Sequence, residues 1–110
     1  MIYIIKRNAT EQQVSEMRES LGSYIKLAVD IERGILAGGG ELHADCEAQL
    51  LPSGGRQENI WGADWIPETR EVRFEALINI RSRQNNPSMT ILDEGVRRRV
   101  EAIVRSLLET

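Results

Sequence analysis

The residues best suited to chemistry are the only histidine of the chain and the carboxylates that follow it at two-residue spacing. His43, Asp45 and Glu47 alternate with apolar residues in the stretch 41–51, a pattern that predicts a strand with these three side chains on one face. His43 and Asp45 are therefore candidate ligands for one metal ion, because imidazole and carboxylate groups together suit zinc, manganese or iron. A solvated sheet face is the simpler interpretation, since one histidine cannot supply a multi-histidine ligand set.

General acid–base catalysis is a second use for the same face. Crowded carboxylates raise one another's pKa, and a neighbouring histidine titrates near neutral pH, so His43, Asp45 and Glu47 are also the candidate catalytic residues. The only cysteine, Cys46, falls on the opposite, apolar side of the predicted strand, where a packed and inert thiol is expected. No motif in the sequence predicts a cofactor.

A separate group of polar residues lies in the loop before the last predicted helix. Arg81, Arg83 and Asn86 place guanidinium and amide donors within a few residues, which predicts a site for a small anionic ligand. Solvated or structurally hydrogen-bonded arginines are the alternative. The three glycines at 38–40 do not predict a phosphate-binding loop, because that mechanism needs a helix directly after the glycines and a strand is expected there.

The two tryptophans of the chain, Trp61 and Trp65, lie within five residues of each other and are either core residues or part of a partner surface. Leu77 is expected on the outer face of the strand predicted at 71–80, where it would add to such a surface. Because no catalytic set is complete, these residues favour a binding or interaction domain that self-associates into a homo-oligomer. A small metal-dependent or acid–base enzyme is the alternative.

Composition limits the classes of protein that remain. The chain has 110 residues, 41% of them apolar and 28% charged, which predicts one globular domain. A net charge of −3 argues against general binding of nucleic acid, and no apolar run approaches the length of about 20 residues that crosses a bilayer. The basic residues at the N-terminus follow the apolar run, which is the wrong order for a signal peptide. Together with the single cysteine, this order predicts a cytoplasmic protein.

The elements that must position these residues follow from periodicity. Thr10 and Gln13 form a capping-box pattern, which predicts a helix over 11–21, and Asp93 is placed to cap a second helix with apolar residues at helical spacing. Strands are expected at 1–6, 23–31, 41–51, 56–66 and 71–80, with a hairpin connection or bulged extension at 32–40. The sequence therefore predicts an α+β domain: an antiparallel four-stranded meander, with residues 1–6 as a fifth strand, and two helices packed on one face.

Four stretches together resemble a small family of bacterial proteins, frequent in cyanobacteria, that is catalogued as a domain of unknown function. They are 24–30, 38–47, Trp61-Gly62 and 77–81, and the resemblance covers nearly the whole chain. It implies no activity or cofactor, but it places one set of residues in a common motif: His43, Asp45, Glu47, Trp61, Asn79 and Arg81. The chain departs from the family pattern in the loop after Arg81, where Ser82 and an asparagine replace a proline and a glycine.

Overall fold

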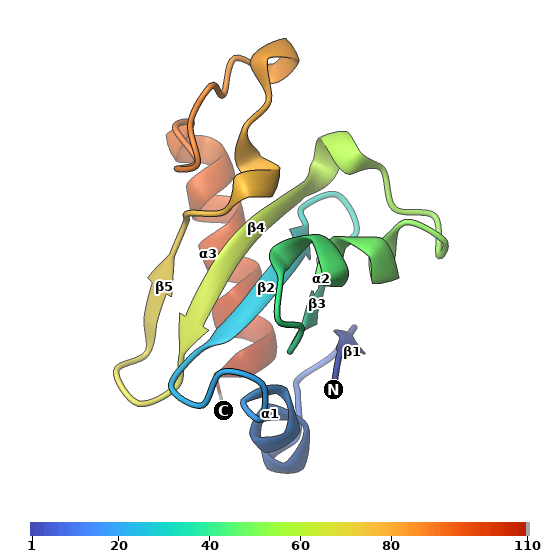
Figure 1. Ribbon diagram of the computed structural model, residues 1–110, viewed down its shortest axis with the longest axis vertical. Coiled ribbons are helices and arrows are strands. Elements are labelled where there is room, and N and C mark those ends of the chain that lie inside the picture. Colours follow the sequence, from blue (N-terminus) through green and yellow to red (C-terminus); the bar gives the residue numbers. More distant parts are fainter. Residues whose placement is uncertain (110) are drawn as a thin grey trace.

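The computed structural model describes residues 1–109, which form an antiparallel sheet covered by helices (Figure 1). The strands are β1 (Tyr3–Ile5), β2 (Ile25–Asp30), β3 (Ile35–Gly38), β4 (Ile60–Ile66) and β5 (Glu71–Arg73). The helices are α1 (Glu11–Met17), α2 (His43–Leu50) and α3 (Glu94–Leu108), with short 3-10 turns η1 (Gln57–Asn59), η2 (Leu77–Asn79) and η3 (Ser82–Gln84). The predicted α+β class and antiparallel sheet are confirmed, including the N-terminal strand.

The two predicted helix starts are also confirmed. The Gln13 backbone N–H donates to Thr10 Oγ1 at 3.1 Å, and the Thr10 N–H donates to Gln13 Oε1 at 2.9 Å, which completes the capping box. At the start of α3, the Val96 N–H donates to Asp93 Oδ1 at 3.0 Å. Among the described residues, no helix combines the length and the apolar character that crossing a membrane requires.

The strand predicted at 41–51 is wrong, because this stretch forms helix α2. His43, Cys46, Glu47 and Leu50 turn inward at spacings of three and four residues, while the alanines between them are exposed. A run of alanine, glutamate, glutamine and leucine favours a helix, and it contains no β-branched or aromatic residue that would favour a strand. The apparent two-residue alternation was therefore compatible with both periods, and residue propensity decides between them.

The strands do not follow one another in the simple order of a meander. The sheet order is β1-β3-β2-β4-β5, and every neighbouring pair is antiparallel. Strand β3 lies inside the stretch 32–40, and α2 then carries the chain across the sheet to β4 on the far side of β2 (Figure 1). The strand predicted at 71–80 ends at Arg73, after which the chain leaves the sheet and enters η2.

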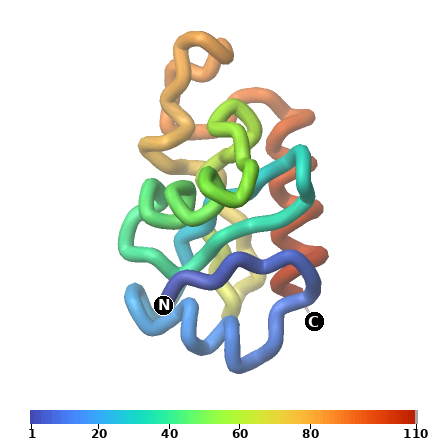
Figure 2. Tube along the Cα trace, turned by 90° about the vertical axis from the view of Figure 1, so that its right-hand side faces the viewer, coloured from blue at the N-terminus to red at the C-terminus, as the bar shows by residue number. Residues whose placement is uncertain are grey.

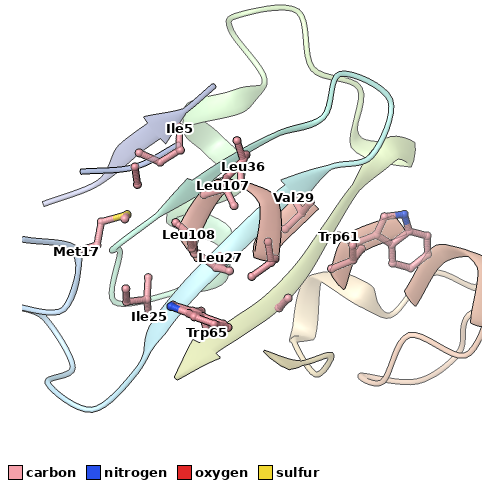
Figure 3. Packing of buried hydrophobic residues seen from close by; sticks show 14 of the residues in the cluster. Ile5, Met17, Ile25, Leu27, Val29, Leu36, Trp61, Trp65, Leu107 and Leu108 are labelled. Atoms are coloured by element: carbon pink, nitrogen blue, oxygen red, sulfur yellow. The ribbon is translucent and has the colours of Figure 1, made fainter. Parts of the chain in front are cut away.

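The two faces of the sheet pack against different helices. The larger core cluster joins one face of the sheet to α1 and α3, so the two predicted helices do pack on the same face (Figure 3). The smaller cluster joins Ala28, Ala37 and Ile60 on the other face to Cys46 and Leu50 of α2. Seen edge-on, α2 and α3 lie on opposite sides of the strands (Figure 2). This second helical layer sets the surroundings of His43.

Candidate functional site

Helix α2 turns His43 and Glu47 toward the sheet, one helical turn apart, whereas Asp45 is exposed on the other side. Residues two apart on a helix do not face each other, so His43 and Asp45 do not form the ligand pair that a strand would have made. Within residues 1–109, no three His, Cys, Asp or Glu side chains lie close enough to hold a metal ion together. The site is therefore built from contacts that α2 makes with β4 and with the segment after β5.

The partner of His43 is Asp64, in the middle of β4. The His43 Nε2–H donates to Asp64 Oδ1 at 2.8 Å and also lies 3.1 Å from the Ala63 carbonyl oxygen. Both neighbours accept hydrogen bonds, so Nε2 carries the proton. In the neutral ring, Nδ1 is then the nitrogen that can accept a proton. Sequence reasoning missed Asp64, although a lone aspartate between two tryptophans in an apolar strand signals a buried carboxylate that needs a partner.

One turn further along α2, Glu47 meets the guanidinium of Arg81. Glu47 Oε2 lies 3.8 Å from Arg81 Nη2, which is beyond hydrogen-bond length, and has no hydrogen-bond partner in the described chain. Burial raises the pKa of Glu47, and the nearby Arg81 offsets only part of this effect. Arg81 itself lies over the Trp61 ring at 4.4 Å from its centroid, and burial lowers its pKa.

Arg81 is a structural residue, which corrects its predicted role in anion binding. Its Nε–H donates to the Ile78 carbonyl at 2.9 Å, Nη1 donates to the Gln57 carbonyl at 2.7 Å, and Nη2 donates to the Ile60 carbonyl. The guanidinium thus joins the segment after η2 to the start of β4. Its donors are occupied by protein carbonyls, so they do not form an open site for an anion.

Of the other two predicted anion-binding residues, Asn86 pairs with Arg81 through its backbone, but its side chain is used within the loop. Asn86 is buried, and its side-chain amide donates to the Asn79 carbonyl at 2.8 Å and to the Thr90 carbonyl at 3.1 Å. Arg83 is exposed. The Asn86 amide therefore stabilises the loop from within. Arg81 and Asn86 both make structural hydrogen bonds, which was the alternative to an anion-binding role.

Asn79 is fully buried. We call the group of polar residues that connects α2, β4 and the segment after β5 the polar layer beneath α2; its members are His43, Glu47, Asp64, Asn79 and Arg81. The Asn79 side-chain amide hydrogen-bonds both backbone groups of Gly62: Oδ1 accepts from the Gly62 N–H at 2.8 Å, and Nδ2 donates to the Gly62 carbonyl at 3.0 Å. A Cβ atom at Gly62 would overlap Ala76, so only glycine allows this close approach of the segment after β5. Asn79 thus takes the place of a neighbouring strand where β5 has already ended.

His43 also lines a pocket of about 280 Å³ between α2 and the segment after β5, here called the His43 pocket. Three large apolar residues at this pocket are exposed: Leu77 at 71%, Leu42 at 57% and Met89 at 44%. The predicted exposure of Leu77 is confirmed. Trp61 and Trp65 are only 4% and 3% exposed and lie in the core, so they do not form the surface that was predicted with Leu77 (Figure 3).

Cys46 is buried in the smaller core cluster, as predicted, although it lies on a helix and not on the predicted strand. Burial raises the pKa of its thiol, which keeps the sulfur protonated at neutral pH. Its Sγ–H lies 3.4 Å from the Lys26 carbonyl oxygen. Cys46 is therefore a core residue beside the site and does not supply a nucleophile to it.

A family model described as "Protein of unknown function (DUF5674)" matches residues 3–107 of the chain. The match includes every residue of the polar layer beneath α2. No curated protein and no solved structure matches the chain.

Proposed function

The chain belongs to the DUF5674 family of proteins of unknown function. From its surface we propose that it is a binding domain that pairs with a second copy of itself. The observation that carries this proposal is the exposure of Leu42, Leu77 and Met89 around the His43 pocket. Clustered apolar side chains of this kind mark interaction surfaces more often than isolated ones do.

The charges at the same surface suit a second copy of the chain. Lys26 and Glu75 both line the His43 pocket, so one surface carries a positive and a negative side chain beside its apolar residues. A two-fold contact brings the same surface of both copies together, and a surface with both charges can be complementary to itself. The segment that holds Leu77 and Met89 stands out from the body of the molecule, where a partner can reach it (Figure 1). A cytoplasmic location remains part of the proposal.

The wild-type chain is expected to sediment as a dimer at micromolar concentration, and Leu77→Arg is expected to sediment as a monomer. Leu77 is 71% exposed in the single chain, so its replacement removes an interface contact at little cost to folding. Sedimentation equilibrium measures the mass, and circular dichroism checks that the variant is folded.

Leu51→Arg is the matched control, because Leu51 is also exposed, at 41%, but does not line the His43 pocket. This variant should remain dimeric. A monomeric wild type would contradict self-association, and an equal loss of the dimer in both variants would contradict the location of the interface.

A second candidate function, acid–base catalysis, rests on the hydrogen bond of 2.8 Å between His43 and Asp64 beside the pocket. A carboxylate on Nε2–H orients the ring and fixes its tautomer, so Nδ1 can remove a proton from a bound water. The water oxygen then attacks a carbonyl carbon, and the proton passes from Nδ1 to the leaving group. The roles predicted for Asp45 and Glu47 do not enter this candidate, because Asp45 is exposed and Glu47 faces Arg81.

Hydrolysis of p-nitrophenyl acetate tests this candidate, with the release of p-nitrophenolate as the readout. The wild type should exceed an equal concentration of imidazole, His43→Gln should lose the excess, and Asp64→Asn should reduce it by roughly tenfold or more. Asp45→Asn is the control and should leave the rate unchanged. A wild-type rate equal to that of imidazole would remove the catalytic candidate without affecting the dimer.

A further inference from the structure

A second and larger hollow lies at the other end of the molecule, bounded by α1, the β4–β5 turn and the C-terminal end of α3. It measures about 510 Å³, and we call it the α1 groove. Small-molecule sites in proteins typically measure about 300–1,000 Å³, so the α1 groove has the volume of a ligand site. None of the residues that line it belongs to the polar layer beneath α2.

The α1 groove has apolar walls. The apolar part of the lining consists of Trp65 and Leu108, which are both buried, together with Val14 of α1 and Pro67 of the turn. Trp65 presents part of its indole ring to the groove, although the residue as a whole is only 3% exposed. These walls suit a ring or a hydrocarbon chain.

Arg70 supplies the second, independent observation. Its backbone is left-handed, with φ of 61°, a conformation in which glycine is unstrained and arginine is not. The turn itself uses only backbone groups of Arg70: its N–H donates to the Ile66 carbonyl at 2.8 Å, and its carbonyl accepts from Arg105 at 3.0 Å. Folding of this turn therefore gives no reason for an arginine side chain at position 70.

The Arg70 guanidinium is also weakly held. The Arg70 side chain is 68% exposed, and within residues 1–109 its one ion-pair partner is Glu109, whose carboxylate lies 3.8 Å away and already accepts a hydrogen bond from Arg105 at 3.1 Å. The other arginine of the groove, Arg18, is committed to the Gly22 carbonyl and to Glu68, each at 3.0 Å. Arg70 is thus the cation of the α1 groove that can bind an incoming anion.

The charge of the lining selects the class of anion. Three glutamates, Glu11, Glu19 and Glu109, line the α1 groove against the two arginines, which leaves one net negative charge. Such a lining opposes a polyanion such as a nucleotide more strongly than a single carboxylate, which can be placed at Arg70 and away from the glutamates. We propose that the α1 groove binds a small monocarboxylate whose apolar ring or chain lies against Trp65, Val14 and Leu108 and whose carboxylate pairs with Arg70. This site does not depend on dimerisation at the His43 pocket.

The test uses the full chain and 2-naphthoate as the probe, with 2-naphthamide and pyrophosphate as controls. Binding is followed by the amide and indole N–H signals in two-dimensional NMR, in which Trp65→Phe identifies the Trp65 signal. We expect 2-naphthoate to shift the Trp65 indole signal and to bind more tightly than 2-naphthamide. Arg70→Gly should weaken 2-naphthoate binding by roughly tenfold or more, because it removes a charge-assisted hydrogen bond.

Arg70→Gly is expected to stabilise the fold although it weakens binding, so a loss of affinity cannot be explained by unfolding. The substitution relieves the left-handed backbone, so the thermal midpoint should rise while the affinity falls. Arg70→Asn is the second variant, because asparagine tolerates this left-handed conformation. Arg83→Gln in η3 is the control for the loss of one positive charge. An unshifted Trp65 signal, equal affinities of wild type and Arg70→Gly, or tighter binding of pyrophosphate than of 2-naphthoate would each overturn the proposal.

Discussion

Asn79→Ala is expected to lower the free energy of unfolding by about 3–5 kcal/mol. The substitution leaves the N–H and the carbonyl of Gly62 without partners at a fully buried position, and it removes a further hydrogen bond of 3.1 Å to the Met89 carbonyl. Buried polar groups that lose their partners keep the cost of leaving water. Urea denaturation, followed by circular dichroism, measures the change.

Two variants show that hydrogen bonding, and not lost volume, is the cause. Asn79→Asp has nearly the same shape but turns a donor toward the Gly62 and Met89 carbonyls into an acceptor, so it should destabilise to a similar extent. Asn8→Ala removes an exposed hydrogen bond to the Ser106 carbonyl and should cost about 1 kcal/mol or less. Equal costs for Asn79→Ala and Asn8→Ala would contradict the assigned role of Asn79.

Arg81→Met is expected to cost about 3–5 kcal/mol, because it removes the cation nearest to a buried carboxylate and the donor to the carbonyls of Gln57, Ile60 and Ile78. The cost should be smaller in a Glu47→Gln background, where no carboxylate is left without its cation. A double-mutant cycle from urea denaturation measures this coupling. A cost that is the same in both backgrounds would show that Glu47 and Arg81 do not interact.

The cost of Arg81→Met should also grow as the pH rises. In the folded protein the pKa of Glu47 is raised, and loss of Arg81 raises it further, because the arginine is the group that lowers it. A raised folded-state pKa gives stability that is present below the unfolded-state pKa and is lost as the pH rises through the folded-state pKa. The difference in unfolding free energy between wild type and Arg81→Met should therefore be smallest near pH 4 and largest near pH 7.

The helix starts were predictable because short-range chemistry determines them, whereas the helix predicted over 11–21 ends at Met17. Thr10 with Gln13, and Asp93 with the N–H of Val96, form caps within four residues, so no distant contact is needed to place them. Helix α2 was not predictable in the same way. Its apolar residues fit a two-residue and a four-residue period, and the helix-forming composition of the stretch, which lacks β-branched residues, is the signal that favours the helix covering the second sheet face.

The site was predictable as a set of residues but not as a set of contacts. Four members of the predicted motif, His43, Glu47, Asn79 and Arg81, do lie in one polar layer between α2 and β4. Their partners lie far away in the sequence, as Asp64 does from His43, and hydrophobic periodicity does not predict contacts between such distant residues. The same limit explains why Arg81 was expected to bind an anion, since two of its three carbonyl partners, Gln57 and Ile60, lie more than 20 residues earlier in the chain.

The short length of β5 has a consequence for the solubility of the protein. An unpaired strand edge is a template for pairing with other chains, and β4 would present such an edge from Gly62 to its N-terminal end once β5 has ended. The Asn79 amide occupies both hydrogen-bonding groups of Gly62, and the bulk of the η2 segment lies against the strand there. One buried side chain therefore covers the part of β4 that β5 leaves unpaired and protects it from pairing with other chains.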